Sequence, residues 1–305
     1  MITARSFTLI VLSIFSFFLL SAMFNPANAR VRIVATIFPL YEMAMEVGGT
    51  KAKVHLLLPP GAEPHSFEPK PSDLREVETA QLILMVGAGL DNWLEDLLEA
   101  VKERSAKKVV LRLSDGAPLI KAEHDHHHSA VDPHVWLDFK WDIEFVGKLI
   151  EALASLDPDN VTYYKQNGYR YIEKLHALDS AFKKGLEKCK TRTFVVGGHG
   201  AFAYLARAYR LRQLSLYGLS PDARPTPKKM VNMAKTMRRL DIGTIFFEGT
   251  VSSKLAEVLS KETGAKISTL YTGASLTRQQ IENSVSFISL MYTNLESLRL
   301  GLGCK

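Results

Sequence analysis

The sequence predicts an α/β protein with two lobes, each built on a mainly parallel sheet, joined by one long helix. Two observations support this prediction. Short apolar, β-branched runs alternate with amphipathic stretches, which is typical of parallel strands covered by helices on both faces. About 30 residues with helical spacing, uninterrupted by proline, separate two such alternating regions. The 305 residues are enough for two cores.

The first alternating region contains four expected strands, each a short apolar run, at residues 31–37, 54–58, 82–86 and 109–113. Pro59, Pro60 and Gly61 end the second of these strands in a loop. Helices are expected in residues 41–47, from Pro71 onward and in residues 92–102.

The long helix is expected to begin where Asp157, as N-cap, precedes Pro158, and its spacing continues to Cys189. The alternation then restarts. We expect strands in residues 193–196, 244–247 and 266–270, and helices in residues 201–209, 228–239, 253–263 and 280–300. The predicted domains are a first lobe over residues 30–156, a linking helix over 157–189 and a second lobe over 190–305.

Residues 1–29 have the pattern of a cleaved signal peptide. Arg5 is their only charged residue, residues 7–24 are almost entirely apolar, and Ala27 and Ala29 form an A-x-A cleavage site after Pro26. The alternative is a signal anchor, since 18 apolar residues could just span a bilayer. We expect cleavage and a soluble exported protein, and because no cysteine lies at the cleavage site we expect no lipid anchor.

Export affects the interpretation of the two cysteines. In an oxidising compartment Cys189 and Cys304 could form a disulfide, although nothing in their spacing distinguishes this from two unpaired thiols. The charge pattern is less informative. The 38 Lys and Arg residues exceed the 32 Asp and Glu residues, but they are scattered without a run of five, so we expect no nucleic-acid partner.

Three of the nine histidines stand in loops framed by glycine or proline: His65, His134 and His199. His65 and His199 also follow predicted strands, and open α/β sheets bind ligands beyond the carboxyl ends of their strands. Neutral imidazole is the commonest metal ligand and suits zinc. Each histidine alone would be unremarkable, but three in such loops favour a metal site. His55 and His176 lack this framing and are interpreted as structural.

A separate histidine-rich loop is expected over residues 121–131. Its histidines are His124, His126, His127 and His128. Such tracts are typical of metal binding, but a flexible tract does not hold a defined tetrahedral geometry. We therefore predict that it captures metal loosely, apart from the main site.

Four segments resemble one family: residues 35–40 (ATIFPL), 60–69 (PGAEPHSFEP), 132–138 (DPHVWLD) and 198–202 (GHGAF). On these segments the chain resembles the substrate-binding proteins of zinc and manganese ABC importers, the cluster A-I or zinc-uptake type. The resemblance implies lobes rigidly joined by the long helix, with the metal in the cleft between them. It implies ligand roles for His65, His134 and His199. It also implies a periplasmic protein that delivers its metal to an inner-membrane permease with its ATPase, and we expect a monomer.

The chain departs from the family at one position. The family usually supplies a fourth ligand, often an aspartate, after the penultimate strand of the second lobe, but residues 270–274 (LYTGA) contain none. The fourth ligand could be water, Glu248 or a histidine of the loop, and we favour Glu248 as a hydrogen-bonding partner of a ligating histidine. Without that carboxylate the donors are nitrogens, which favours Zn²⁺ over Mn²⁺.

Two other functions are compatible with three histidines. A zinc hydrolase uses three ligands and an open position, but no H-E-x-x-H segment is present. An extracellular metal buffer or adhesin would bind metal without a transporter. We expect a binding protein and no enzyme.

Overall fold

The computed structural model describes residues 30–104, 106–121, 131–219, 225–249 and 254–305. The expected signal peptide and the four histidines of the histidine-rich loop lie outside these ranges. Val31–Lys305 form one compact unit. Within the described ranges, no helix combines the length and the apolar character needed to cross a membrane.

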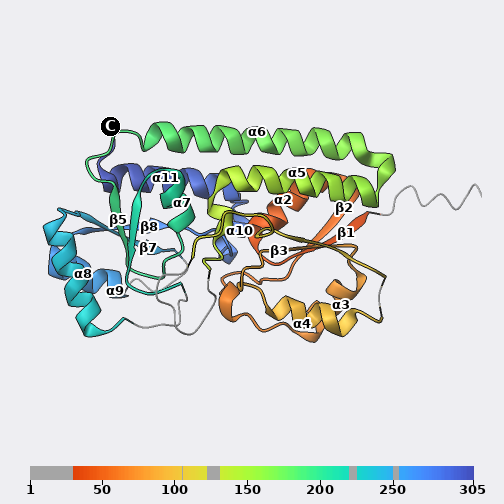
Figure 1. Cartoon of the computed structure of the whole chain (residues 1–305), viewed down its shortest axis with the longest axis horizontal. Helices are drawn as coiled ribbons and strands as arrows, with labels where there is room; N and C mark the ends of the chain where they lie inside the picture. Colours follow the sequence, from red (N-terminus) through yellow and green to blue (C-terminus); the bar gives the residue numbers. More distant parts are fainter. Residues whose placement is uncertain (1–29, 105, 122–130, 220–224, 250–253) are drawn as a thin grey trace, which may run out of the picture. The chain divides into compact units, whose positions relative to one another are not determined.

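Two four-stranded sheets form the framework (Figure 1), and every strand pair in them is parallel. The first sheet has the order β2-β1-β3-β4, and the second has the equivalent order β6-β5-β7-β8. The strands are β1 Val31–Ala35, β2 Ala52–Leu56, β3 Leu82–Met85, β4 Val109–Arg112, β5 Thr193–Val196, β6 Arg212–Ser215, β7 Thr244–Glu248 and β8 Lys266–Leu270. The predicted α/β class with parallel sheets is confirmed.

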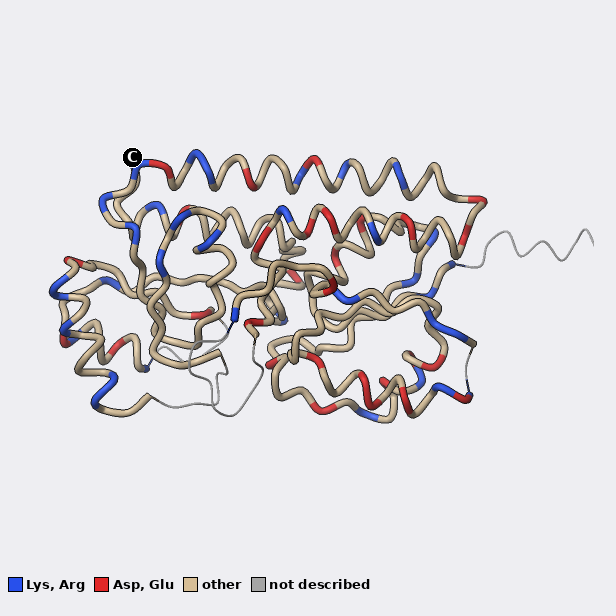
Figure 2. The backbone as a smooth tube through the Cα atoms, viewed as in Figure 1, with Lys and Arg blue, Asp and Glu red and all other residues tan. Residues whose placement is uncertain are grey.

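The helices connect these strands and cover the sheets. They are α2 Phe38–Gly48, α3 Pro71–Thr79, α4 Trp93–Val101, α5 Phe139–Leu156, α6 Val161–Gly185, α7 Ala203–Ala208, α8 Pro227–Arg239, α9 Lys254–Thr263, α10 Arg278–Glu282 and α11 Phe287–Leu302. Lys and Arg residues are interspersed with Asp and Glu over these elements (Figure 2).

Both faces of the first sheet are buried because successive residues of a strand point to opposite sides. Val34, Ile83 and Met85 pack on the side of α3 and α4, whereas Ile33 and Leu84 pack on the side of α2 and α5. The near-continuous apolar runs of these strands follow from this double coverage.

The second sheet is covered in the same way. Val195 and Ile245 pack against α8 and α9, whereas Val196 and Phe246 share a core with α11. That core also contains Ile33 of the first sheet and extends along α6, so a single buried cluster contacts both sheets.

The linking helix α6 is shorter than predicted, with 25 residues. Asp157 and Pro158 begin a separate 3-10 turn, Pro158–Asn160, and the helix ends at Gly185 before the segment that leads to Cys189. Gly168 lies where α5 approaches α6, since a Cβ atom there would meet Ile150 Cδ1 at 2.3 Å. This close contact explains a glycine within a long helix.

Three further differences concern elements that the sequence pattern did not reveal. Helix α5 and edge strand β6 were not predicted, and the predicted helix over residues 280–300 is two helices, α10 and α11. Ser284, with φ at 53°, lies in the turn that separates them. A disulfide joins Cys189 to Cys304 and fastens the chain end after α11 to the segment after α6.

Candidate metal centre

The structure brings together three histidines that are far apart in the sequence. His65 lies on a single 3-10 turn, Pro64–Ser66, that follows β2, and His199 lies in the loop after β5. His134 immediately precedes another such turn, Val135–Leu137. One ring nitrogen from each lies within 4.8 Å of the others. Neither His55, which is in β2, nor His176, which is exposed on α6, belongs to this group.

Two of the three separations between the ring nitrogens match the geometry of a tetrahedral metal ion. His134 Nε2 lies 3.4 Å from His65 Nε2 and 3.3 Å from His199 Nε2. Zinc–nitrogen bonds of about 2.0–2.1 Å at the tetrahedral angle place neighbouring ligand nitrogens about 3.3–3.4 Å apart. Both separations agree with that geometry, so these ring nitrogens fit Zn²⁺.

A carboxylate orients His134. Asp132 Oδ1 accepts a hydrogen bond from the backbone N–H of His134 at 2.9 Å and lies 2.7 Å from its Nδ1. Both side chains are buried. A proton on Nδ1 leaves the lone pair on Nε2, the atom that faces the other two rings. This is the carboxylate–histidine arrangement that holds metal-binding imidazoles in one tautomer.

Glu248 occupies the corresponding position beside His199. Its Oε2 lies 3.1 Å from His199 Nδ1, and its Oε1 accepts a hydrogen bond from Thr272 Oγ1 at 2.8 Å. Burial by itself raises the pKa of Glu248, but the neighbouring His199 outweighs it and holds that pKa below its usual value. Conversely, burial lowers the pKa of His199, and the Glu248 carboxylate outweighs it, so this pKa lies above its usual value.

His65 is held by its own turn. Glu63 caps this turn, because its Oε1 accepts a hydrogen bond from the backbone N–H of His65 at 3.2 Å. Trp93 Nε1 donates a hydrogen bond to the carbonyl oxygen of Pro64 at 3.3 Å, which ties the turn to α4. Burial raises the pKa of Glu63, and the hydrogen bond from the His65 N–H opposes this rise. The nearby Glu248 carboxylate raises the same pKa further.

The topology explains where these residues meet. In each sheet the chain passes from the first strand to the neighbour on one side and then crosses to the other side, so the strand order reverses between the first and third strands. Open α/β sheets bind ligands beyond the carboxyl ends of the strands at such a point. In the second sheet these strands are β5 and β7. His199 follows β5 and Glu248 ends β7, so both lie at the carboxyl ends of these two strands.

The stretch in which a fourth ligand was sought has another role. Thr272 donates its hydroxyl to Glu248, and its carbonyl oxygen accepts a hydrogen bond from Trp136 Nε1 at 2.8 Å. Residues 270–274 therefore support the carboxylate beside His199. Asp132 was not predicted as the partner of His134, although its position two residues before the histidine was a usable signal.

Comparison with known proteins identifies the family. Residues 33–301 match the family described as zinc-uptake complex component A, periplasmic. The chain belongs to this family. The match confirms the resemblance that the four sequence segments indicated.

Individual relatives agree with this assignment. Over 281 residues the chain is 34% identical to the zinc-binding lipoprotein AdcA of Streptococcus pneumoniae serotype 4. This alignment covers 90% of this chain and 56% of AdcA. It is 31% identical over 280 residues to the high-affinity zinc uptake system protein ZnuA of Bacillus subtilis, covering 88% of this chain and 87% of that protein. The chain thus spans about half the length of AdcA.

A solved structure has the same fold. The crystal structure of Zn(II)-bound AdcA from Streptococcus pneumoniae superposes with a TM-score of 0.77 at 33% identity, covering 90% of this chain and 58% of that one. The two-lobed α/β architecture of this chain is therefore that of a zinc-uptake type binding protein.

Proposed function

We propose that this protein is a periplasmic solute-binding protein that captures Zn²⁺ and delivers it to an ABC permease and its ATPase in the inner membrane. The observation that supports this most directly is the position of His134 Nε2, which lies 3.4 Å from His65 Nε2 and 3.3 Å from His199 Nε2, with a carboxylate beside two of the three rings. Membership of the zinc-uptake family and the names of the relatives support the same cargo.

In this proposal His65, His134 and His199 are the zinc ligands, each through Nε2. Glu248 remains the partner of His199, because its Oε2 is directed to Nδ1 and its Oε1 to Thr272. A water molecule or a histidine of the tract at residues 124–128 would complete a tetrahedral site. Three nitrogen donors favour Zn²⁺ over Mn²⁺, which prefers oxygen ligands.

These residues would capture zinc by reversible coordination, and no covalent bond of the protein would form or break. Zinc binding requires neutral imidazoles, and Asp132 and Glu248 supply acceptors for the Nδ1 protons that remain after binding. The burial of His134 and His199 keeps bulk water from these two ligands. Release to a permease would then require that the rings separate.

Competition titration of the purified protein against a chromophoric zinc chelator tests the ligand assignment. We expect one tight site in the wild type. His134→Ala should weaken it more than about 100-fold, beyond the range typical of outer partners. His176→Ala is the matched control, because this histidine is exposed on α6, and it should leave the affinity unchanged. Equal affinities of the wild type and His134→Ala would contradict the assignment.

Three further measurements separate transport from the rival functions. Cells lacking the protein should take up less ⁶⁵Zn²⁺ at limiting zinc, and the wild-type gene should restore uptake that His134→Ala does not. Unchanged uptake alongside tight binding would favour a metal buffer or adhesin. Hydrolysis of ester or peptide substrates by the zinc-loaded protein, lost in His199→Ala, would favour a hydrolase.

A further inference from the structure

Helix α7 contacts the chain segment that contains His134. The hydroxyl of Tyr204 accepts a hydrogen bond from the backbone N–H of Ile120 at 3.1 Å and donates one to the carbonyl oxygen of Asp132 at 2.7 Å. One buried side chain thus joins the two stretches of chain that flank residues 122–130.

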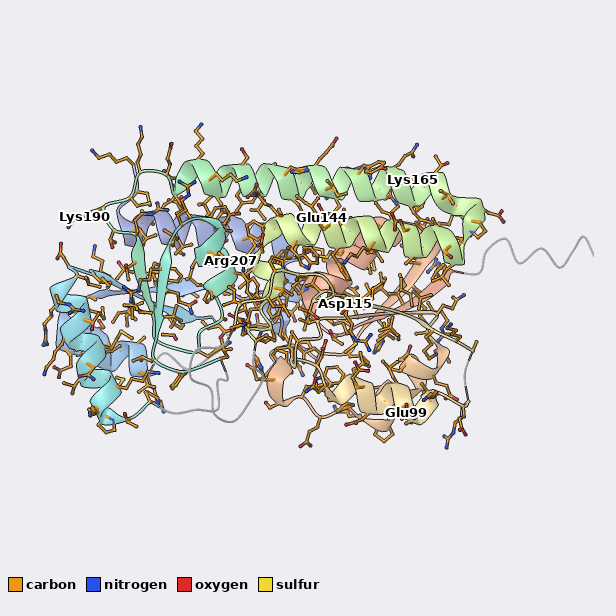
Figure 3. The ribbon with its side chains drawn as sticks, in the orientation of Figure 1. Glu99, Asp115, Glu144, Lys165, Lys190 and Arg207 are labelled. Carbon is orange, nitrogen blue, oxygen red and sulfur yellow. A yellow bond between two sulfur atoms is a disulfide. The ribbon has the colours of Figure 1, made fainter. Side chains whose placement is uncertain are left out.

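Arg207, one turn further along α7, contacts the same segment at two more places. Its Nη1 donates a hydrogen bond to the carbonyl oxygen of Pro118 at 2.7 Å, and its Nη2 lies 3.5 Å from Asp138 Oδ2. The guanidinium also lies over the ring of Tyr204, 4.9 Å from its centroid. Figure 3 places Arg207 on α7, between the second sheet and α5.

The two flanking stretches are also joined to each other. The backbone N–H of Asp132 donates a hydrogen bond to the carbonyl oxygen of Ile120 at 2.8 Å, and Lys121 and Val131 form an antiparallel bridge. Asp132 is therefore fixed at three points: its N–H by Ile120, its carbonyl oxygen by Tyr204 and its Oδ1 by His134.

We propose that Tyr204, assisted by Arg207, is a positioning residue for zinc binding: it holds Asp132, and through Asp132 the imidazole of His134, in register with His199. This inference rests on the proposed function. The register follows from the chain itself, because α7 begins four residues after His199. Tyr204 therefore connects the backbone just before His134 to α7, the helix that follows His199.

Tyr204 is suited to this role because its hydroxyl both accepts and donates. Burial, opposed by the Ile120 N–H and reinforced by the nearby Asp132, raises the pKa of Tyr204 to about 12. The hydroxyl consequently keeps its proton and can donate to the Asp132 carbonyl throughout the ordinary pH range. Phenylalanine would preserve the ring and remove both hydrogen bonds.

The test compares Tyr204→Phe with Tyr209→Phe. Tyr209 is the matched control, since it is also buried, lies five residues further on and donates its hydroxyl to Asp179 Oδ1 at 3.1 Å. Both variants lose a buried hydroxyl and should lose similar thermal stability. Arg207→Gln, at a partly exposed position, provides a second variant that keeps the buried hydroxyl of Tyr204.

Three readouts apply to each variant: zinc affinity, the visible spectrum of bound Co²⁺, which depends on ligand geometry, and amide hydrogen exchange of residues 118–134 in metal-free protein. We expect Tyr204→Phe to weaken zinc binding measurably, by up to about tenfold, because it acts through Asp132 and the direct outer partners of metal ligands change affinity by about tenfold or more. It should also change the Co²⁺ spectrum and speed exchange in this segment. Arg207→Gln should act in the same direction, more weakly.

The outcomes are distinct. Tyr209→Phe should lower stability and leave the affinity, the Co²⁺ spectrum and the exchange of residues 118–134 unchanged. A Tyr204→Phe protein with the zinc affinity and Co²⁺ spectrum of the wild type would overturn this inference and leave the proposed function standing. A wild-type protein that binds neither Zn²⁺ nor Co²⁺ would overturn the proposed function and this inference with it.

Discussion

Replacing Asp132 by asparagine should weaken zinc binding while the protein stays folded. The carboxylate lies 2.7 Å from His134 Nδ1 and accepts the backbone N–H of His134 at 2.9 Å. An asparagine oxygen can keep both contacts but lacks the negative charge that makes the imidazole a stronger ligand. Outer partners of metal-binding histidines change affinity by about 10- to 100-fold. Because the geometry is retained, we expect a loss of about tenfold, or about 1.4 kcal/mol.

The structure also predicts a separate effect of this substitution on stability. Asp132 Oδ2 is buried and has no hydrogen-bond partner among the residues that the structure describes, so an amide group placed there would lack an acceptor among them. An unsatisfied buried donor costs about 1–3 kcal/mol. Affinity and the free energy of unfolding must therefore be measured on the same preparation, by chelator competition and by urea denaturation of the metal-free protein.

Asp91→Asn is the control for that stability effect. Asp91 is fully buried and accepts hydrogen bonds from Thr36 Oγ1 and from the backbone N–H groups of Val86 and Gly87, with no contact to a proposed ligand. It should lower stability and leave the zinc dissociation constant unchanged. Equal zinc affinities of Asp132→Asn and the wild type would refute the role assigned to this carboxylate.

The remaining predictions concern pH dependence, the disulfide and helix packing. As the pH is lowered, zinc affinity should begin to fall while the pH is still above 6.5, because Glu248 raises the pKa of His199 above that value and zinc must displace the proton. Glu248→Gln should move the start of this fall to lower pH. A zinc affinity that does not change down to about pH 5 would contradict the mechanism. The double variant Cys189→Ser/Cys304→Ser, which opens a link across 115 residues, should lower the free energy of unfolding by about 2–5 kcal/mol, and an unchanged urea midpoint would contradict this. Gly168→Ala should destabilise by about 1–3 kcal/mol by overpacking α5 against α6, whereas the stabilisation expected from helix propensity alone would refute the packing argument.

Much of the fold could be predicted because its strands are buried on both faces. Strands such as β3 and β5 are short apolar runs, and the alternation with helices specifies parallel pairing. β6 was missed because it is an edge strand with the sequence RQLS and no buried residue, so its formation depends on pairing with β5. The long helix ends at Gly185, earlier than predicted, although helical spacing continues to Cys189, which the disulfide joins to Cys304.

In the candidate site too, some residues could be predicted from the sequence and others could not. His65, His134 and His199 were recognisable from the glycine and proline that frame them, and the structure places them together. The contacts that orient them were harder to predict. Glu248 was named because it ends a strand, and Asp132 lies only two residues before His134, but the role of Tyr204 depends on two segments of chain meeting in space. Tyr204 contacts a carbonyl 72 residues away, which no local pattern encodes.

Anomalous X-ray scattering at the zinc absorption edge, from crystals of the zinc-loaded protein, would locate the bound ion. We expect one strong peak about 2.0–2.1 Å from the Nε2 atoms of His65, His134 and His199. Asp132 and Glu248 should contact the Nδ1 atoms of His134 and His199 in that crystal. A strong peak elsewhere, or zinc bound directly by Glu248 with His199 turned away, would contradict the ligand assignment.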